Sequence, residues 1–258
     1  ALNLINEFRG EKPTVAVLKH TNPCGLAQRE TVFEAWQAAL AGDPVSAFGG
    51  IIIANTTIDE ATAEAINEIF YEALVAPAFS ERAKEILLKK KKRIVLQLKD
   101  ERLPARQFKS LLGGVLQQDA DFKSETPEEL RPVTEKRADE ALLQELFFAN
   151  RVVKHLKSNA IAVTKNRQLI GMGCGQTSRI DALRQAIEKA RRMGFDPAGS
   201  VLASDAFFPF ADSVEAAHKA GISAVVQPGG SIRDQDSIAY CNQHGLCMVF
   251  SGVRHFKH

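Results

Sequence analysis

Several features that mark special classes of protein are missing from this sequence. No uncharged apolar run in its 258 residues approaches the roughly 20 residues that a bilayer-spanning helix needs, and the N-terminus lacks a charged-then-apolar secretory pattern. The four cysteines are scattered and form no Cys-x-x-Cys pair, so we expect reduced thiols rather than a disulfide framework. These absences predict a soluble, cytoplasmic protein with no membrane partner.

An excess of charge of either sign is also missing. The 33 Lys and Arg residues nearly balance the 31 Asp and Glu residues, and the formal net charge of +2 gives no bulk attraction to nucleic acid. The basic run Lys89-Lys-Lys-Lys-Arg93 has no interleaved aromatic residues and is interpreted as a solvated turn. We therefore expect no nucleic-acid partner, and an anionic ligand must be met by a local cluster of cations.

What the sequence does contain is typical of a globular chain. Hydrophobic residues make up 45% and charged residues 25%, which excludes disordered, collagen-like and coiled-coil chains. Short apolar runs predict strands at residues 14–18, 51–53, 73–76, 93–98, 159–163, 169–172, 201–203, 224–226 and 247–250. Amphipathic patterns predict helices at residues 1–8, 30–40, 57–70, 81–89, 139–157, 212–220 and 233–244 and from residue 178 onward. The residues Thr57-Ile-Asp-Glu60 form a capping-box pattern at the start of one helix.

The two halves of the chain repeat this layout. Arg29 and Arg179 each open the first helix after a loop, and the next strand begins 22 residues later in both halves. Alternating strands and helices favour a sheet covered by helices on both faces. We predict an α/β protein of two tandem three-layer α/β/α subdomains, residues 1–130 and 131–258, divided within the polar stretch 119–137.

The first candidate for a catalytic site is the pair Lys19-His20. It directly follows the predicted strand 14–18 and precedes a predicted loop, Thr21-Asn-Pro-Cys-Gly25. In open α/β sheets, ligands bind in the crevice where strands end. A histidine titrates near neutral pH and is the usual general base, and an adjacent lysine can stabilise a developing oxyanion. The alternative is that Lys19 is a solvated surface charge and His20 a hydrogen-bond donor of the loop.

A second candidate is the glycine-rich segment Gly171-Met-Gly-Cys-Gly175, which leads into a helix N-terminus. Free N–H groups and the helix dipole favour a phosphate or carboxylate there, and Arg179 adds a charged fork. Ser178 and Asp181 have the spacing of a capping pair. Gln176 stands where the dinucleotide fingerprint needs its third glycine, and the P-loop ending is also absent. A tight turn without a ligand is the alternative.

A third candidate site is a group of aromatic residues. Three phenylalanines lie close together in Ser204-Asp-Ala-Phe-Phe-Pro-Phe210, and the acidic residue Asp212 follows them. Flat rings beside an acid suit a planar heterocycle with amide-like donors. Core packing is the alternative, and we expect it for at least one of the three rings. The segment Gln227-Pro-Gly-Gly-Ser231 ends the next strand at the same expected edge, where glycines allow a ligand to approach the backbone.

A catalytic zinc ion is not expected. The loop Asn22-Pro-Cys-Gly25 matches part of the signature of zinc-dependent deaminases, which require His-x-Glu and Pro-Cys-x-x-Cys. No His-x-Glu occurs, and Ala27 stands where the second cysteine would lie. The sequence therefore disfavours a zinc deaminase.

Six ordered motifs give the chain a family resemblance. They are Lys19-His-Thr-Asn-Pro-Cys-Gly25, Ser46-Ala-Phe-Gly49, Ser158-Asn159-Ala, Gly171-x-Gly-x-Gly-Gln-x-Ser-Arg179, Ser204-Asp-Ala-Phe-Phe-Pro-Phe210 and Arg254-His-Phe-Lys-His258. Over nearly its whole length the chain resembles the formyltransferase part of the AICAR transformylase/IMP cyclohydrolase family of purine biosynthesis. The resemblance implies a tandem cytidine-deaminase-like fold without the catalytic zinc.

The resemblance also implies an activity. A formyl group would pass from the cosubstrate 10-formyltetrahydrofolate to the 5-amino group of AICAR, an aminoimidazole carboxamide ribonucleotide. His20 is then the expected base for the amine proton, and Lys19 the expected stabiliser of the oxyanion. Motif matching implies nucleotide contacts from Gly49, Glu72, Asn159, Arg179, Phe207 and Arg254, and folate contacts from Ile180, Asp212, Ser231 and Ile232. A homodimer with active sites shared between subunits is implied as well.

Three departures from the family limit this expectation. The family's Arg-Tyr-Gly-Glu-Asn-Pro-His segment, which helps to hold the nucleotide and would precede Ala1, is not in this sequence, and neither is the cyclohydrolase half. Cys174 stands where the family usually has alanine. The sequence is therefore expected to be part of a longer protein. The alternative function is a catalytically deficient nucleotide-binding or assembly module left by N-terminal truncation.

Overall fold

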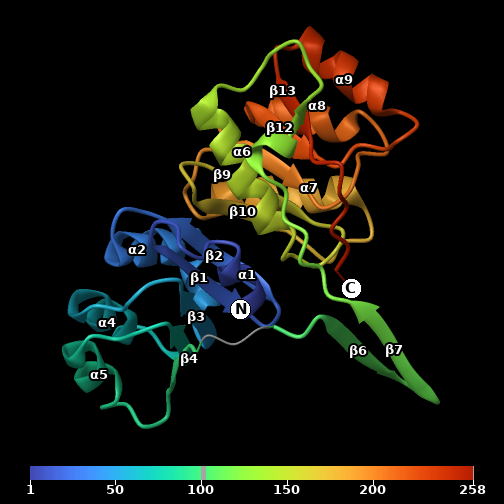
Figure 1. Ribbon diagram of the computed structural model, residues 1–258. Helices are drawn as coiled ribbons and strands as arrows, with labels where there is room; N and C mark the ends of the chain where they lie inside the picture. The colour runs from blue at the N-terminus through green and yellow to red at the C-terminus, as the bar shows by residue number, and fades with distance from the viewer. Residues whose placement is uncertain (100–102, 258) are drawn as a thin grey trace.

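The computed structural model describes residues 1–99 and 103–257 and shows a mixed α/β fold with two large sheets and a projecting hairpin (Figure 1). The first sheet contains β1 (Thr14–Lys19), β2 (Asn22–Gln28), β3 (Gly50–Ala54), β4 (Tyr71–Ala76) and β5 (Ile94–Gln97). The second contains β8 (Arg131–Pro132), β9 (Ile161–Thr164), β10 (Leu169–Gly173), β11 (Val201–Ser204), β12 (Ala224–Gln227) and β13 (Cys247–Phe250). The hairpin consists of β6 (Arg106–Leu111) and β7 (Gly114–Asp119). The predicted α/β class is confirmed.

The helices lie between and outside these sheets. They are α1 (Leu2–Asn6), α2 (Val32–Gly42), α3 (Pro44–Ala47), α4 (Glu60–Asn67), α5 (Glu81–Leu87), α6 (Glu140–Val153), α7 (Arg179–Arg192), α8 (Asp212–Lys219) and α9 (Asp234–Gln243), with a 3-10 turn, η1, at Pro127–Glu129. Each helix and strand predicted from the sequence overlaps one of the observed elements. Within the described residues, no helix is long and apolar enough to cross a membrane.

The two sheets have the same topology. The strand order is β2-β1-β3-β4-β5 in the first sheet and β10-β9-β11-β12-β13 in the second, where β8 is added beyond β13. In each sheet the second strand of this order is antiparallel to both of its neighbours. The three strands that follow run parallel to one another. The layout that repeats in the sequence is therefore also a repeat of strand order and direction.

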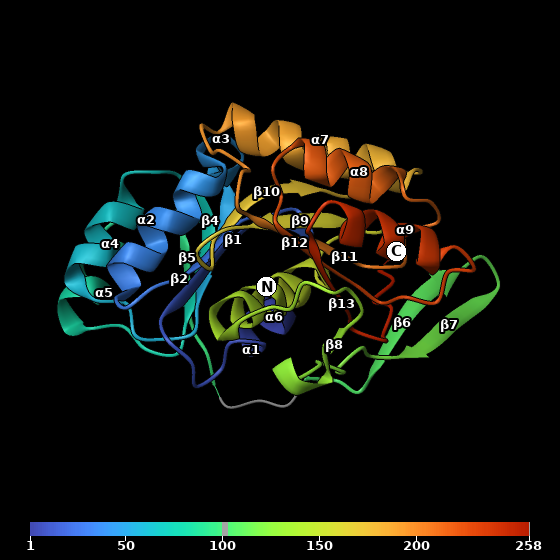
Figure 2. The same cartoon turned by 90° about the horizontal axis from the view of Figure 1, so that it is seen from above.

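An inner layer of helices fills the space between the sheets (Figure 2). One hydrophobic core contains Leu4, Ile5 and Phe8 around α1 together with Leu146 and other residues of α6, and it includes side chains from both sheets. The outer faces have separate cores, under α2, α4 and α5 for the first sheet and under α7, α8 and α9 for the second. The inner helix layer is therefore shared, whereas the sequence predicted a separate one for each half.

Arg29 has a different role from the predicted one. It lies two residues before Thr31, the N-cap of α2, and does not open the helix. Its guanidinium donates to Asn166 O at 2.7 Å and to Gln168 Oε1 at 2.7 Å, and Ala27 and Gln168 form a β-bridge. Arg29 therefore joins the edges of the two sheets where β2 meets β10.

Two other local predictions are wrong. The segment Asn22–Gly25 is the start of β2 rather than a loop, because it completes a two-residue hairpin with β1. The capping box at residues 57–60 does not form, because Asp59 is the N-cap of α4 and accepts from Thr62 N at 2.8 Å. The β6–β7 hairpin was not predicted, because its strands mix polar and apolar residues on both exposed faces.

The glycines of the predicted glycine loop allow β10 to pack closely on α7. A Cβ at Gly173 would lie 1.9 Å from Ala182 O, and one at Gly171 would lie 2.2 Å from Ala186 O. Both glycines belong to β10, so the segment up to residue 173 is a strand and not a free loop. Close contact between strand and helix explains these two glycines without a ligand.

This packing gives the first prediction. Gly173→Ala should lower the free energy of unfolding by about 1–3 kcal/mol or more, since the added methyl group overlaps a helix carbonyl. Gly113→Ala is the matched control, because no atom lies within 4 Å of the added Cβ. Urea denaturation followed by circular dichroism measures both variants, and equal stability of the two would contradict this account of Gly173.

Candidate functional site

A cavity of about 420 Å³ opens in the second half of the chain. Its lining comes from the loop before β9, the N-terminus of α7, the segment after β11, the start of α8 and the C-terminal segment. It brings together six residues that the resemblance predicted for ligand contacts, namely Asn159, Arg179, Ile180, Phe207, Asp212 and Arg254. We call this cavity the main pocket.

Arg179 forms part of the pocket wall rather than a free cation. It is 8% exposed, and it forms a buried ion pair with Asp205. It also donates to Ser204 Oγ at 2.9 Å and to Asn159 Oδ1 at 2.8 Å. Because both terminal nitrogens have internal acceptors, Arg179 holds Asn159 and the end of β11 in place. The predicted contact between Arg179 and a nucleotide stays a prediction.

Asp205 is the residue that links the pocket wall together, although no ligand role was predicted for it. Its side chain is fully buried and accepts from Ala160 N at 3.1 Å as well as from Arg179. Its carbonyl accepts from His255 N at 3.0 Å. The sequence did carry a signal for this role, because Asp205 is an acidic residue directly after a buried strand.

The aromatic residues of the segment after β11 divide between core and pocket. Phe208 is buried in the core of the second sheet, as expected for at least one of the three rings. Phe207 and Phe210 line the main pocket, and Phe256 joins them from the C-terminal segment. The pocket therefore has aromatic groups from two parts of the chain.

Positive charge reaches the pocket from Arg254. The side chain is exposed, and its guanidinium carbon lies 5.5 Å from the centre of the Phe256 ring. Within residues 1–99 and 103–257, Arg254 has no carboxylate partner, unlike Arg179. The motif that contains Arg254 was predicted to end at His258, which lies outside the described residues.

The N-terminus of α7 also faces this pocket. Ser178 is its N-cap, but the Ser178 side chain makes no capping hydrogen bond, so the predicted capping pair with Asp181 does not form. Thr177, Ser178 and Ile180 line the pocket around this terminus. A helix N-terminus without a side-chain cap leaves backbone N–H groups for an acceptor such as a phosphate oxygen.

Lys19 and His20 lie on the first sheet, outside the lining of the main pocket. Lys19 ends β1 and donates from Nζ to Phe48 O at 2.6 Å. His20 is exposed in the two-residue turn to β2, with a positive φ of 54°. Because β1 is antiparallel to β3, this pair lies at the carboxyl end of β1 but at the amino ends of β3 and β4.

Gly49 and Glu72 lie at the same edge of the first sheet. Gly49, which has a φ of 68°, donates to Phe70 O at 2.8 Å, and a Cβ there would lie 3.3 Å from Lys19 Nζ. Glu72 is an exposed residue near the start of β4. The structure thus groups Lys19, Gly49 and Glu72 at one edge of the first sheet. The other predicted nucleotide contacts line the main pocket.

One hydrogen bond connects these two places. Asn22 Oδ1, two residues after His20, accepts from Lys157 N at 3.0 Å. Lys157 is in turn two residues before Asn159, which lines the main pocket. The β1–β2 turn therefore lies beside the loop that forms one rim of the pocket.

Ser231 and Ile232 lie in the loop between β12 and α9 and do not line the main pocket. Ser231 Oγ accepts from Arg233 N at 3.1 Å, and Ile232 is fully exposed. The guanidinium carbon of Arg233 lies 5.2 Å from the centre of the Phe210 ring. This loop therefore borders the pocket through Arg233. Among the described side chains, no group of three or more His, Cys, Asp or Glu residues could hold a metal ion.

Comparison with known proteins assigns the family. A family model described as AICARFT/IMPCHase bienzyme matches residues 1–189. Two curated relatives, each named bifunctional purine biosynthesis protein PurH, come from Bacteroides thetaiotaomicron and Chlorobaculum parvum and are 57% and 50% identical to this chain. Both alignments cover 100% of this chain and 50% of the relative, so the chain spans about half the length of these relatives. The chain belongs to the AICARFT/IMPCHase bienzyme family.

Similarity to solved structures is weaker. A diaminohydroxyphosphoribosylaminopyrimidine deaminase/5-amino-6-(5-phosphoribosylamino)uracil reductase from Thermotoga maritima is similar with a TM-score of 0.31 and 20% identity. The match covers 42% of this chain and 34% of that chain. This similarity is too low to assign a fold or a function.

The second prediction concerns the pocket wall. Arg179→Ala should lower the free energy of unfolding by about 3–5 kcal/mol, because it leaves the buried Asp205 carboxylate without its cation. Arg184→Ala on the same helix removes an exposed ion pair to Asp181 and should cost less than about 1 kcal/mol. Urea denaturation measures both, and a small loss for Arg179→Ala would show that the buried pair does not stabilise the fold.

Proposed function

We propose that this chain carries the formyltransferase site of the family. In this reaction the formyl group of 10-formyltetrahydrofolate passes to the 5-amino group of AICAR. The observation that carries the proposal is the main pocket, which gathers Asn159, Phe207 and Arg254 around a helix N-terminus. These residues come from three distant parts of the chain. The family resemblance implies, independently of the pocket, that each of them contacts the nucleotide.

The main pocket suits a nucleotide in size and chemistry. Its volume of about 420 Å³ lies within the range of roughly 300–1,000 Å³ that is usual for small-molecule sites. The N-terminus of α7 and the exposed Arg254 can bind the phosphate. The rings of Phe207, Phe210 and Phe256 offer flat apolar surface for the imidazole carboxamide.

The proposed fold is a tandem of cytidine-deaminase-like subdomains. Its support is the strand order shared by the two sheets, with the same pattern of antiparallel and parallel neighbours. The zinc ligands of a deaminase are not part of this proposal, because Ala27 replaces a required cysteine and Cys24 is buried in β2. A zinc deaminase is therefore a poorer account of the chain than a formyltransferase.

The pair Lys19-His20 can supply the proton transfer and the oxyanion contact. The amine nitrogen of AICAR attacks the formyl carbon, and its proton passes to His20, which is exposed at the turn. The formyl oxygen becomes an oxyanion that the Lys19 ammonium can meet, because Phe48 O uses only one of its three N–H donors. The bond from carbon to N10 of the folate then breaks, N10 takes a proton, and tetrahydrofolate leaves.

The folate side is proposed next to the pocket's aromatic rim. Ile180 and Asp212 line the main pocket, while Ser231 and Ile232 lie in the neighbouring loop. Because Arg233 stacks on Phe210, this loop and the pocket form one surface.

A homodimer with shared active sites is also proposed. The support is the β6–β7 hairpin, which projects from the body of the structure (Figure 1). Every residue of its two strands is exposed, including Phe108, Leu111, Val115 and Leu116. A lone two-stranded hairpin is marginally stable in water, and an exposed group of large apolar side chains is typical of a contact surface. A second copy of the chain is the partner that the resemblance implies.

The third prediction tests the proposed base. His20→Ala should lower turnover by roughly 100-fold or more and change AICAR affinity much less, because general-base catalysis typically contributes 10²–10⁴-fold. His244→Ala replaces an exposed histidine beyond the end of α9 and should leave turnover unchanged. Release of tetrahydrofolate from 10-formyltetrahydrofolate in the presence of AICAR measures both variants. Unchanged turnover in His20→Ala would remove His20 from the mechanism.

The same assay tests the activity itself. Absence of turnover in the correctly folded dimer would reject the formyltransferase for this chain. AICAR binding by calorimetry without any turnover would select the alternative of a catalytically deficient nucleotide-binding module. Lys19→Met should lower turnover as His20→Ala does if the ammonium acts only in the transition state.

The fourth prediction tests the dimer. Leu112→Lys places a charge at the tip of the hairpin and should shift the protein toward the monomer in sedimentation equilibrium. Leu88→Lys adds the same charge at an exposed leucine beyond α5 and should leave the association unchanged. A wild-type protein that is monomeric at all concentrations would contradict the proposed dimer.

A further inference from the structure

The C-terminal segment 251–257 is attached to the body at His255. Arg254 and Phe256 are exposed and line the main pocket, whereas His255 is 2% exposed and points into the body. The contacts of His255 therefore determine where the side chains of Arg254 and Phe256 lie.

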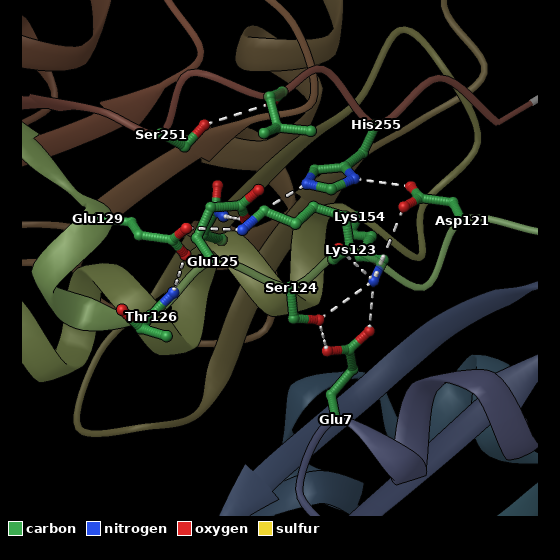
Figure 3. Close-up of polar contacts among 12 residues, drawn as sticks. Glu7, Asp121, Lys123, Ser124, Glu125, Thr126, Glu129, Lys154, Ser251 and His255 are labelled. Carbon is green, nitrogen blue, oxygen red and sulfur yellow. Dashed lines mark hydrogen bonds and ion pairs between the residues drawn. The ribbon is translucent and has the colours of Figure 1, made fainter.

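Two carboxylates hold the imidazole ring (Figure 3). His255 Nδ1 lies 2.6 Å from Asp121 Oδ2, and His255 Nε2 lies 3.3 Å from Glu125 Oε2. The backbone N–H of His255 donates to Asp205 O at 3.0 Å, next to the ion pair in the pocket wall. His255 thus joins the segment after the hairpin to the wall of the main pocket.

The two carboxylates, buried Glu125 and half-exposed Asp121, belong to a wider network. Glu125 Oε2 also accepts from Asn150 Nδ2 at 2.7 Å. Lys154 Nζ lies 4.0 Å from Asp121 Oδ1 and donates to Glu7 Oε1 at 2.8 Å. Because Asn150 belongs to α6 and Lys154 caps it, the network is fixed to the inner helix layer.

His255 is charged at neutral pH. Burial alone would disfavour the imidazolium, but the hydrogen bonds and negative charges of Asp121 and Glu125 outweigh it and raise the pKa of His255 to about 9. Burial would also raise the pKa of Asp121, yet the hydrogen bond from His255 and the charge of Lys154 keep it below its usual value. An imidazolium donates from both ring nitrogens, so it can satisfy both carboxylates at once.

Other titratable groups near this site do not replace His255. Burial lowers the pKa of His155, just beyond the end of α6, to about 4, and its ring contacts Glu7 at 3.0 Å. Lys154 is already bound to Glu7, Ser124 and a backbone carbonyl. Burial and the charges of two neighbouring lysines lower the pKa of Lys257 on the segment itself.

We propose that His255 is a positioning residue, which holds segment 251–257 between Asp121 and Glu125 so that Arg254 and Phe256 stay in the main pocket. The identity of the nucleotide rests on the proposed function, whereas the anchoring of the segment does not. Asp121 then affects ligand binding through His255, although Asp121 itself does not line the main pocket.

The fifth prediction is a pH dependence with a defined sign. The pKa of His255 in the folded protein exceeds the ordinary value of about 6.5, so the anchoring is fully present below pH 6.5 and is lost as the pH rises through about 9. The KM for AICAR should therefore rise above pH 9 more than kcat falls, since the loss concerns binding by Arg254. The protection factors of the amides of residues 251–257, which correct for the base-catalysed rise of the intrinsic exchange rate with pH, should fall over the same range.

Asp121→Asn tests the origin of this dependence. Removing one of the two negative charges should move the midpoint of the loss of protection in residues 251–257 to lower pH by about one unit or more. Glu129→Gln is the matched control, because Glu129 is 46% exposed against 45% for Asp121 and pairs with Lys123 instead of His255. Exchange profiles that are the same in wild type and Asp121→Asn would overturn the proposal. Thermal melting of each variant verifies the fold.

A double-mutant cycle tests whether His255 acts through Arg254. We expect His255→Gln to weaken AICAR binding in calorimetry by about tenfold in the wild-type background and by clearly less in the Arg254→Ala background, where only the placement of Phe256 is still lost. Equal losses in the two backgrounds would show a general structural effect and overturn the positioning role. If the wild-type protein binds no AICAR, the proposed function fails, and the exchange experiment alone then decides the anchoring.

Discussion

Helix α6 must pack against two sheets at once, and the position of the candidate site residues depends on this constraint. Its apolar side chains share one core with α1 and with both sheets. Arg151 strengthens the joint, since it donates to Glu7 O at 2.6 Å and stacks on Phe8 and Phe147. The chain leaves α6 at Lys154 and reaches the rim of the main pocket at Asn159. The same helix therefore supports the core, the buried network and the pocket.

Charges in this region divide into buried ones with internal partners and exposed ones. Arg179, Asp205 and Lys154 are buried and have internal partners: Arg179 and Asp205 pair in the pocket wall, and Lys154 pairs with Glu7 in the network beside it. Arg254 is exposed, and its guanidinium carbon lies over the Phe256 ring; in the proposed function it binds the phosphate. A buried charge without a partner is strongly destabilising, whereas an exposed one is not. This difference explains why two arginines beside one pocket have different tasks.

The sequence predicted where most helices and strands lie. It predicted their ends and their contacts less well. Strong periodicity identified strands such as β11 and helices such as α6, because burial on one or both faces leaves a pattern in the residues. The Pro/Gly content of Asn22–Gly25 indicated a loop, but pairing with β1 makes it a strand. The β6–β7 hairpin left no clear pattern because neither of its faces is buried in this chain.

The sequence by itself determined the α/β class, the repeat of the two halves and the motifs that carry the family resemblance. These follow from local periodicity and from residue types at fixed spacing, which need no long-range contact to be recognised. Only the tertiary structure decided that Arg29 joins the two sheets, that Arg179 is paired with Asp205, and that His255 connects Asp121 and Glu125 to the pocket. The physical reason is that each of these contacts joins residues far apart in the chain, whose meeting depends on how the sheets and helices pack.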